Sequence, residues 1–68
     1  MVLYRKIYDL REDHDRTQQE VADALGISKS TYIRYEKGMR EIPLSLAIQL
    51  AEYYEVSLLY LAGLSDQK

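Results

Sequence analysis

The sequence predicts a small all-α domain in which five short helices enclose one core. Its 68 residues suit a single domain, and hydrophobic residues make up 47% of the chain. Apolar residues recur three and four positions apart, and no segment alternates polar and apolar residues as a strand would. The chain has no cysteine, so neither disulfides nor a thiolate zinc site can hold it together. We therefore expect residues 1–68 to form one domain, with 65–68 as a polar tail.

The first helix is expected over residues 2–14. Leu3, Ile7 and Leu10 lie four and three residues apart, so they fall on one face of a helix. Asp15 follows, and aspartate tolerates the left-handed backbone conformation that ends many helices. The first helix should therefore turn its apolar face to the core and end just before Asp15.

The second helix is expected to begin at Gln18. Thr17 and Glu20 form a capping box, in which each side chain accepts a hydrogen bond from the backbone N–H of the other residue. Gly26 ends this helix because glycine adopts a positive φ without strain. The predicted buried stripe of the helix consists of Val21, Ala22 and Leu25.

The third helix is capped by Ser28 and runs to about Lys37, before Gly38 ends it. Tyr32 and Tyr35 are expected to face the core. The opposite face then meets solvent, and it carries Lys29, Ser30, Ile33, Arg34 and Lys37. A helix with cations and hydrogen-bond donors on one side, joined by a short turn to the helix before it, has the size and chemistry that enter the DNA major groove.

The fourth helix follows a loop at 39–43, and one broad apolar face is expected along it. That face comprises Leu44, Ala47, Ile48, Ala51 and Tyr54. Ser57 can cap a fifth helix that ends at Gly63. This short helix holds a continuous apolar run that its own core can cover only in part, so we expect an exposed patch. The patch is the predicted dimer interface, formed by Leu59, Tyr60 and Leu64.

Charge is unevenly distributed along the chain. The formal net charge is −2, whereas nucleic-acid-binding domains are usually basic. Between residues 27 and 40, however, the only acid is Glu36, and the cations there are Lys29, Arg34, Lys37 and Arg40. A local basic face is therefore expected on an otherwise acidic protein.

Several short motifs occur in order along nearly the whole chain. They include Thr17-Gln18, Glu20-Val21-Ala22, Leu25-Gly26-Ile27-Ser28, Arg34-Tyr35-Glu36-Lys37-Gly38 and Val56-Ser57-Leu58. In their residues and spacing they resemble the lambda-repressor/Cro-like family of helix-turn-helix transcriptional regulators, also called the XRE family. The resemblance implies a compact five-helix, lambda-repressor-like fold with a helix-turn-helix at about 18–37, whose third helix reads DNA.

The resemblance also implies roles for single residues. The family glutamine that matches Gln18 touches the DNA backbone or supports the recognition helix. An arginine and a glutamate that match Arg11 and Glu36 pair inside the family fold. Residues at or near base edges would be Ser28, Lys29, Ser30 and Arg34, and those that approach phosphates would be Lys37 and Arg40.

The expected partner is a double-stranded, palindromic DNA operator. One short helix reads only a few base pairs, so proteins of this architecture place two recognition helices on one face of the DNA. A homodimer is therefore expected, formed in solution or only on DNA, and a sequence-specific repressor is the predicted function. The alternative is a protein-interaction module of the same fold, for example in a toxin–antitoxin or phage regulatory complex.

An enzyme is not expected, because the chain shows no nucleophile–base pair and no phosphate-binding glycine loop. No cofactor and no metal site are predicted either. The single histidine, His14, falls in the last turn of the first helix, where a partial positive charge is favourable. No apolar run is long enough to cross a membrane, and a cytoplasmic location is expected.

Overall fold

The computed structural model describes the backbone of residues 3–67 and the side chains of residues 4–67. The predictions made for Val2, for the Leu3 side chain and for Lys68 lie outside these described residues. The elements in chain order are α1 (Leu3–Asp13), α2 (Gln18–Leu25), α3 (Lys29–Glu36), α4 (Leu44–Tyr54) and α5 (Leu58–Leu61). Residues 3–67 contain no strand. The predicted all-α, five-helix fold is confirmed.

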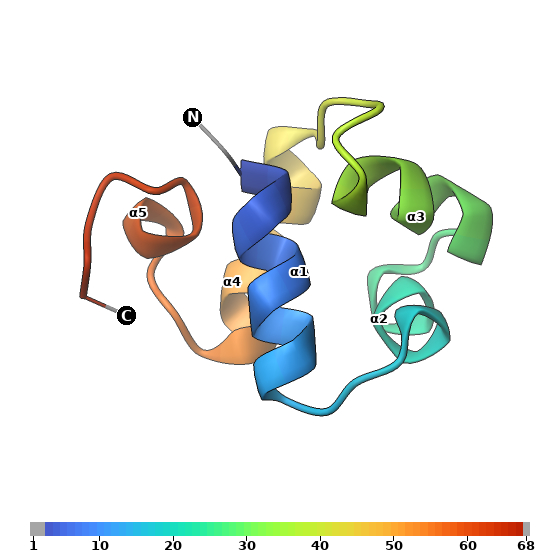
Figure 1. Cartoon of the computed structure of the whole chain (residues 1–68), viewed down its shortest axis with the longest axis horizontal. Helices are drawn as coiled ribbons and strands as arrows, with labels where there is room; N and C mark the ends of the chain where they lie inside the picture. The colour runs from blue at the N-terminus through green and yellow to red at the C-terminus, as the bar shows by residue number, and fades with distance from the viewer. Residues whose placement is uncertain (1–2, 68) are drawn as a thin grey trace.

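The five helices pack around a shared interior. Figure 1 shows α1 running through the middle of the molecule, with α5 on one side and α2 and α3 on the other. Helix α1 contacts α3 and α5, while α4 contacts α2 and α5. The whole fold measures only 29 × 22 × 19 Å. Every helix therefore lies close to a single core.

Local sequence accounts for most helix ends. The Glu20 backbone N–H donates to Thr17 Oγ1 at 3.1 Å, and the Thr17 N–H donates to Glu20 Oε1 at 2.8 Å, which completes the capping box. Ser57 Oγ accepts from the Tyr60 N–H at 3.0 Å. Asp15, with φ 53°, follows α1 in the left-handed conformation. These predicted caps are confirmed, but α5 is shorter than expected because it spans only Leu58–Leu61.

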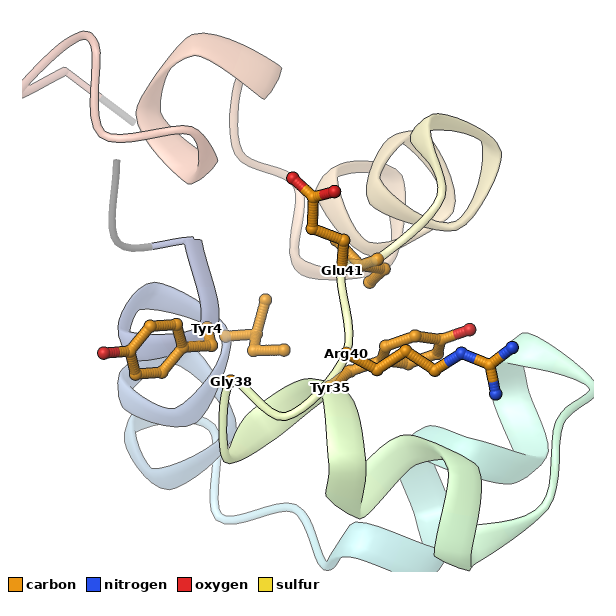
Figure 2. A pocket seen from close by; sticks show the side chains of 7 residues that line it. Tyr4, Tyr35, Gly38, Arg40 and Glu41 are labelled. Carbon is orange, nitrogen blue, oxygen red and sulfur yellow. The ribbon is translucent and has the colours of Figure 1, made fainter.

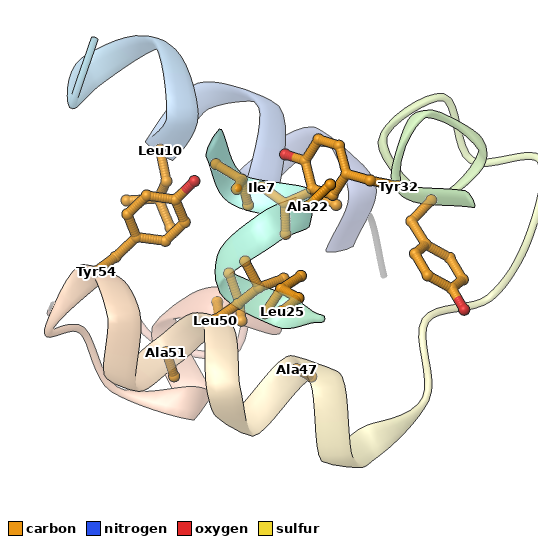
Figure 3. Close-up of a cluster of buried hydrophobic side chains, with 12 residues drawn as sticks. Ile7, Leu10, Ala22, Leu25, Tyr32, Ala47, Leu50, Ala51 and Tyr54 are labelled. Carbon is orange, nitrogen blue, oxygen red and sulfur yellow. The ribbon is translucent and has the colours of Figure 1, made fainter. Parts of the chain in front are cut away.

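The core is formed by side chains from all five helices, and Figure 3 shows those of α1, α2, α3 and α4 converging on one interior. The predicted inward positions of Tyr32 and Tyr35 are confirmed, with 0% and 7% of each residue exposed. The complete buried set is Ile7, Leu10, Val21, Ala22, Leu25, Tyr32, Tyr35, Ala47, Leu50, Ala51, Tyr54 and Leu61.

The prediction for the buried face of α4 is wrong in part. Leu44 and Ile48 are exposed, at 67% and 42%, whereas Leu50 is completely buried. The polar residues Ser45, Gln49 and Glu52 lie on one side of α4, and Leu50 lies on the opposite side, so the predicted face was turned too far towards the polar side. The inner face consists of Ala47, Leu50, Ala51 and Tyr54, and α4 packs against α2 and α5.

Candidate nucleic-acid interface

Helices α2 and α3 form a tight helix-turn-helix. Gly26 ends α2 with φ 71°, and its backbone N–H donates to Asp23 O at 3.1 Å. The Ile27 N–H donates to Ala22 O at 3.1 Å, and the Ile27 side chain packs against the core. Ser28 then caps α3, because its Oγ accepts from the Thr31 N–H at 3.2 Å. The start of α3 is therefore fixed relative to the end of α2.

A buried ion pair holds the other end of α3. Arg11 Nε donates to Glu36 Oε2 at 2.8 Å, and Arg11 Nη2 donates to Glu36 Oε1 at 2.9 Å. The two side chains are only 10% and 5% exposed. Arg11 Nη1 also donates to the carbonyl oxygen of Arg16 at 3.0 Å, which ties the loop after α1 to the same guanidinium. Arg11 and Glu36, which the family resemblance pairs, thus join α1 to the last residue of α3.

Both members of this pair remain charged. Burial by itself would raise the pKa of Glu36, but hydrogen bonds, first among them those from Arg11, hold that pKa below its usual value. The hydrogen bond to Glu36 raises the pKa of Arg11 further above its already high value. The pair is a two-bond, charge-assisted contact, the geometry in which arginine best fixes a carboxylate.

Gln18, the first residue of α2, contacts the same carboxylate. Its Nε2 donates to Glu36 Oε1 at 3.3 Å, and the residue is half-buried. The resemblance implies that Gln18 either touches the DNA backbone or supports the recognition helix. The hydrogen bond to Glu36, the last residue of α3, corresponds to the second of these roles.

The outward face of α3 comprises Lys29, Ser30, Ile33, Arg34 and Lys37. Lys29, Arg34 and Lys37 are exposed, whereas Ile33 is half-buried. The ion pairs among residues 4–67 use only Arg11 and Arg16 as cations. The three cations of this face therefore have no acidic partner within the described part of the chain.

Arg40 lies in the loop between α3 and α4, beside a shallow pocket of ≈ 270 Å³. Figure 2 shows its side chain extending next to Tyr35 and away from Tyr4, which belongs to α1. Arg40 is exposed and, within the described side chains, forms no ion pair. The loop thus adds a fourth unpaired cation close to the C-terminal end of α3.

The predicted dimer residues lie on the other side of α1, on and beyond α5 (Figure 1). Leu59 and Leu64 are 58% and 72% exposed. Tyr60 is half-buried, and Lys6 Nζ lies 4.3 Å from the centroid of its ring. An apolar groove of ≈ 280 Å³ runs beside them, lined by Ile42, Leu44, Ala47, Leu58, Leu59, Ala62 and Leu64.

Of the seven residues that line this apolar groove, sequence reasoning assigned only Leu59 and Leu64 to it. Leu44 was expected in the core, and Leu58 was not separated from the rest of its apolar run. The groove combines side chains of α4, α5 and the segments beside them, so no periodic pattern within one helix could reveal it. The signal available in the sequence was the continuous apolar run Leu58–Leu61, which a helix of four residues cannot bury completely.

Comparison with known proteins adds independent information. A family model described as helix-turn-helix matches residues 7–61. The cryptic phage CTXphi transcriptional repressor RstR of Vibrio cholerae is 41% identical over 61 residues, which cover 90% of this chain and 55% of RstR. The HTH-type transcriptional regulator AnsR of Bacillus subtilis (strain 168) is 36% identical over 63 residues, which cover 93% of this chain and 54% of AnsR. This chain therefore spans about half the length of these relatives.

No solved structure gives a significant match to the chain. In the part of the chain that the structure describes, no helix combines the length and the apolar character needed to cross a membrane. Residues 4–67 also hold no group of three or more histidine, cysteine, aspartate or glutamate side chains placed to bind a metal ion.

Proposed function

Because the chain belongs to the helix-turn-helix family, we propose that it is a sequence-specific DNA-binding transcriptional regulator. It places α3 in the major groove of a palindromic operator and acts as a repressor in the cytoplasm. The name of its relative RstR, a transcriptional repressor, supports repression rather than activation.

One observation supports this proposal above the others. Helix α3 is anchored on its inner side by the buried Arg11–Glu36 pair, while its outward face carries cations without an acidic partner among the described residues. A fixed helix with free donors needs no rearrangement before it meets DNA. Unpaired cations also lose no internal ion pair when they contact phosphates or bases.

The proposed contacts divide by their chemistry. Arg34 reads guanine through two hydrogen bonds, the commonest specific contact in the major groove. The residues proposed at base edges are Ser28, Lys29, Ser30, Ile33 and Arg34. Lys37 and Arg40 contact phosphates and thereby set the register. Gln18 contacts the DNA backbone while its amide supports Glu36.

A homodimer completes the proposed function. A palindromic operator requires two copies of α3 about 34 Å apart on one face of the DNA. Leu59, Tyr60 and Leu64 form the proposed dimer interface, and the adjoining apolar groove enlarges the surface that a partner copy can cover.

Salt-dependent DNA binding tests the proposal. The protein is titrated with mixed genomic DNA at low and high salt, with fluorescence anisotropy as the measurement. Each phosphate contact should steepen the slope of log affinity against log salt by about 0.9. A double Lys37→Gln, Arg40→Gln variant should therefore show a flatter slope than the parent. Absence of binding at low salt would contradict the proposal.

A protein-interaction module of the same fold is the second candidate. The apolar groove beside α5 and the net charge of −2 favour it, because both suit a protein partner better than they suit DNA. A folded protein that does not bind DNA at any salt concentration would support this second function.

A further inference from the structure

One apolar side chain lies on the outward face of α3. Ile33 is half-buried, yet it neither belongs to the core cluster nor packs against it. The other two large apolar residues of α3, Tyr32 and Tyr35, are buried in the core. Core packing therefore explains both tyrosines and leaves Ile33 unexplained.

The neighbours of Ile33 are polar. Lys29 precedes it by four residues and Lys37 follows it by four, so both lie on the same side of the helix. Arg34 is adjacent in sequence and exposed. Ile33 is thus an apolar position in the middle of the cationic surface that would meet the DNA.

Base edges in the major groove offer one apolar group, the 5-methyl group of thymine. An isoleucine set against hydrogen-bonding edges would cover donors and acceptors that it cannot satisfy. Contact with a thymine methyl group would instead remove apolar surface of both the isoleucine and the methyl group from water. Its chemistry therefore matches a thymine and disfavours a cytosine at the same place.

We propose that Ile33 reads the methyl group of a thymine close to the base that Arg34 contacts. This inference rests on the proposed function, because it assumes that α3 lies in the major groove. It assigns to Ile33 a selective role that the phosphate-contacting cations cannot fill.

Removal of single methyl groups from the DNA tests this role. The protein first selects its own binding site from a pool of random duplexes, and each thymine of that site is then replaced in turn by deoxyuridine. Loss of one buried methyl should weaken binding roughly four-fold per half-site at one position. Ile33→Ala should bind the thymine and deoxyuridine duplexes equally, whereas Ile33→Val should keep part of the preference.

The controls separate this inference from the proposed function. Arg34→Ala should still discriminate thymine from deoxyuridine, because the methyl contact does not depend on the guanidinium. Ile33→Ala should lower the unfolding temperature only modestly and should stay folded, since Ile33 is half-buried but lies outside the core cluster. Failure of the folded parent to select any duplex would overturn the proposed function. Selective binding that is insensitive to every deoxyuridine, or equally sensitive in Ile33→Ala, would overturn the role of Ile33 alone.

Discussion

Glu55 ends α4 in the left-handed conformation, with φ 57° and ψ 44°. This conformation costs a residue with a Cβ roughly 1–2 kcal/mol, and glycine is the residue usually found there. Glu55→Gly should therefore raise the free energy of unfolding by about 1 kcal/mol, as measured by urea denaturation.

Asp15 provides a matched control, because it also has a positive φ, of 53°. Aspartate tolerates this conformation better than glutamate does, so Asp15→Gly should stabilise the protein less. A Glu55→Gly variant no more stable than the parent would show that the strain at this position is negligible.

Glu36 should make stability sensitive to acid. Its pKa in the folded protein lies below the ordinary value of 4.5, so the unfolded chain binds a proton more readily. The contribution of Glu36 is therefore complete above about pH 4.5 and is lost as the pH falls through the folded-state pKa. Glu36→Gln should lower the free energy of unfolding at pH 7 by up to about 3–5 kcal/mol, because it removes the buried carboxylate that neutralises Arg11 and leaves it only the exposed Glu12 as an ionic partner. Urea denaturation across the acid range measures both effects.

Glu12 offers the control for this pair. Its Oε2 lies 3.2 Å from Arg11 Nη1, but the Glu12 side chain is 54% exposed. Exposed pairs contribute at most about 1 kcal/mol, so Glu12→Gln should change stability little. Equal losses of unfolding free energy in Glu12→Gln and Glu36→Gln would contradict the expectation that the buried Arg11–Glu36 pair stabilises the fold more than the exposed pair does.

We propose that α3 and the loop after it make different kinds of DNA contact. Arg34→Ala should weaken binding to the selected site by about 1–3 kcal/mol and relax the preference at one base position. Arg40→Ala should weaken binding to all sequences alike and flatten the salt dependence, because a phosphate carries no sequence information. Anisotropy titrations with the selected duplex and a scrambled duplex measure the difference.

Glu41 gives a further comparison in the same loop. It is exposed and next to Arg40, but its charge is negative, so Glu41→Gln should not weaken binding. An Arg34→Ala variant that retained the parent's affinity and selectivity would mean that the outward face of α3 is not the recognition surface.

The proposed homodimer would join two whole molecules through the surface beside α5. Leu59 is 58% exposed and lines the apolar groove, so Leu59→Asp would place a charge where a partner copy is expected. Analytical ultracentrifugation with and without a palindromic operator should show two copies of the parent on the duplex. The variant should bind as single copies with lower affinity.

Ile48→Asp is the matched control for this change. Ile48 is an exposed apolar residue of α4, 42% exposed, but it is not among the residues that line the groove. The Ile48→Asp variant should therefore still bind the operator as two copies. A Leu59→Asp variant that kept two-fold stoichiometry and full affinity would exclude the proposed interface.

Across these scales, the sequence by itself determined the features that depend on near neighbours. The capping box at Thr17, the cap at Ser28 and the left-handed end at Gly26 each close within three or four residues. Such contacts join residues that are close in the sequence, so their residue types are sufficient to predict them. The inward Tyr32 and Tyr35 follow similarly from the spacing of apolar residues along one short helix.

Only the tertiary structure decided which surfaces stay exposed. The apolar groove brings Leu44 of α4 together with Leu58 and Leu59 of α5, which lie far from it in the sequence. The lack of core contact at Ile33 is likewise a property of the assembled helices. The physical reason is that burial depends on neighbours distant in the sequence, whose positions no local pattern contains.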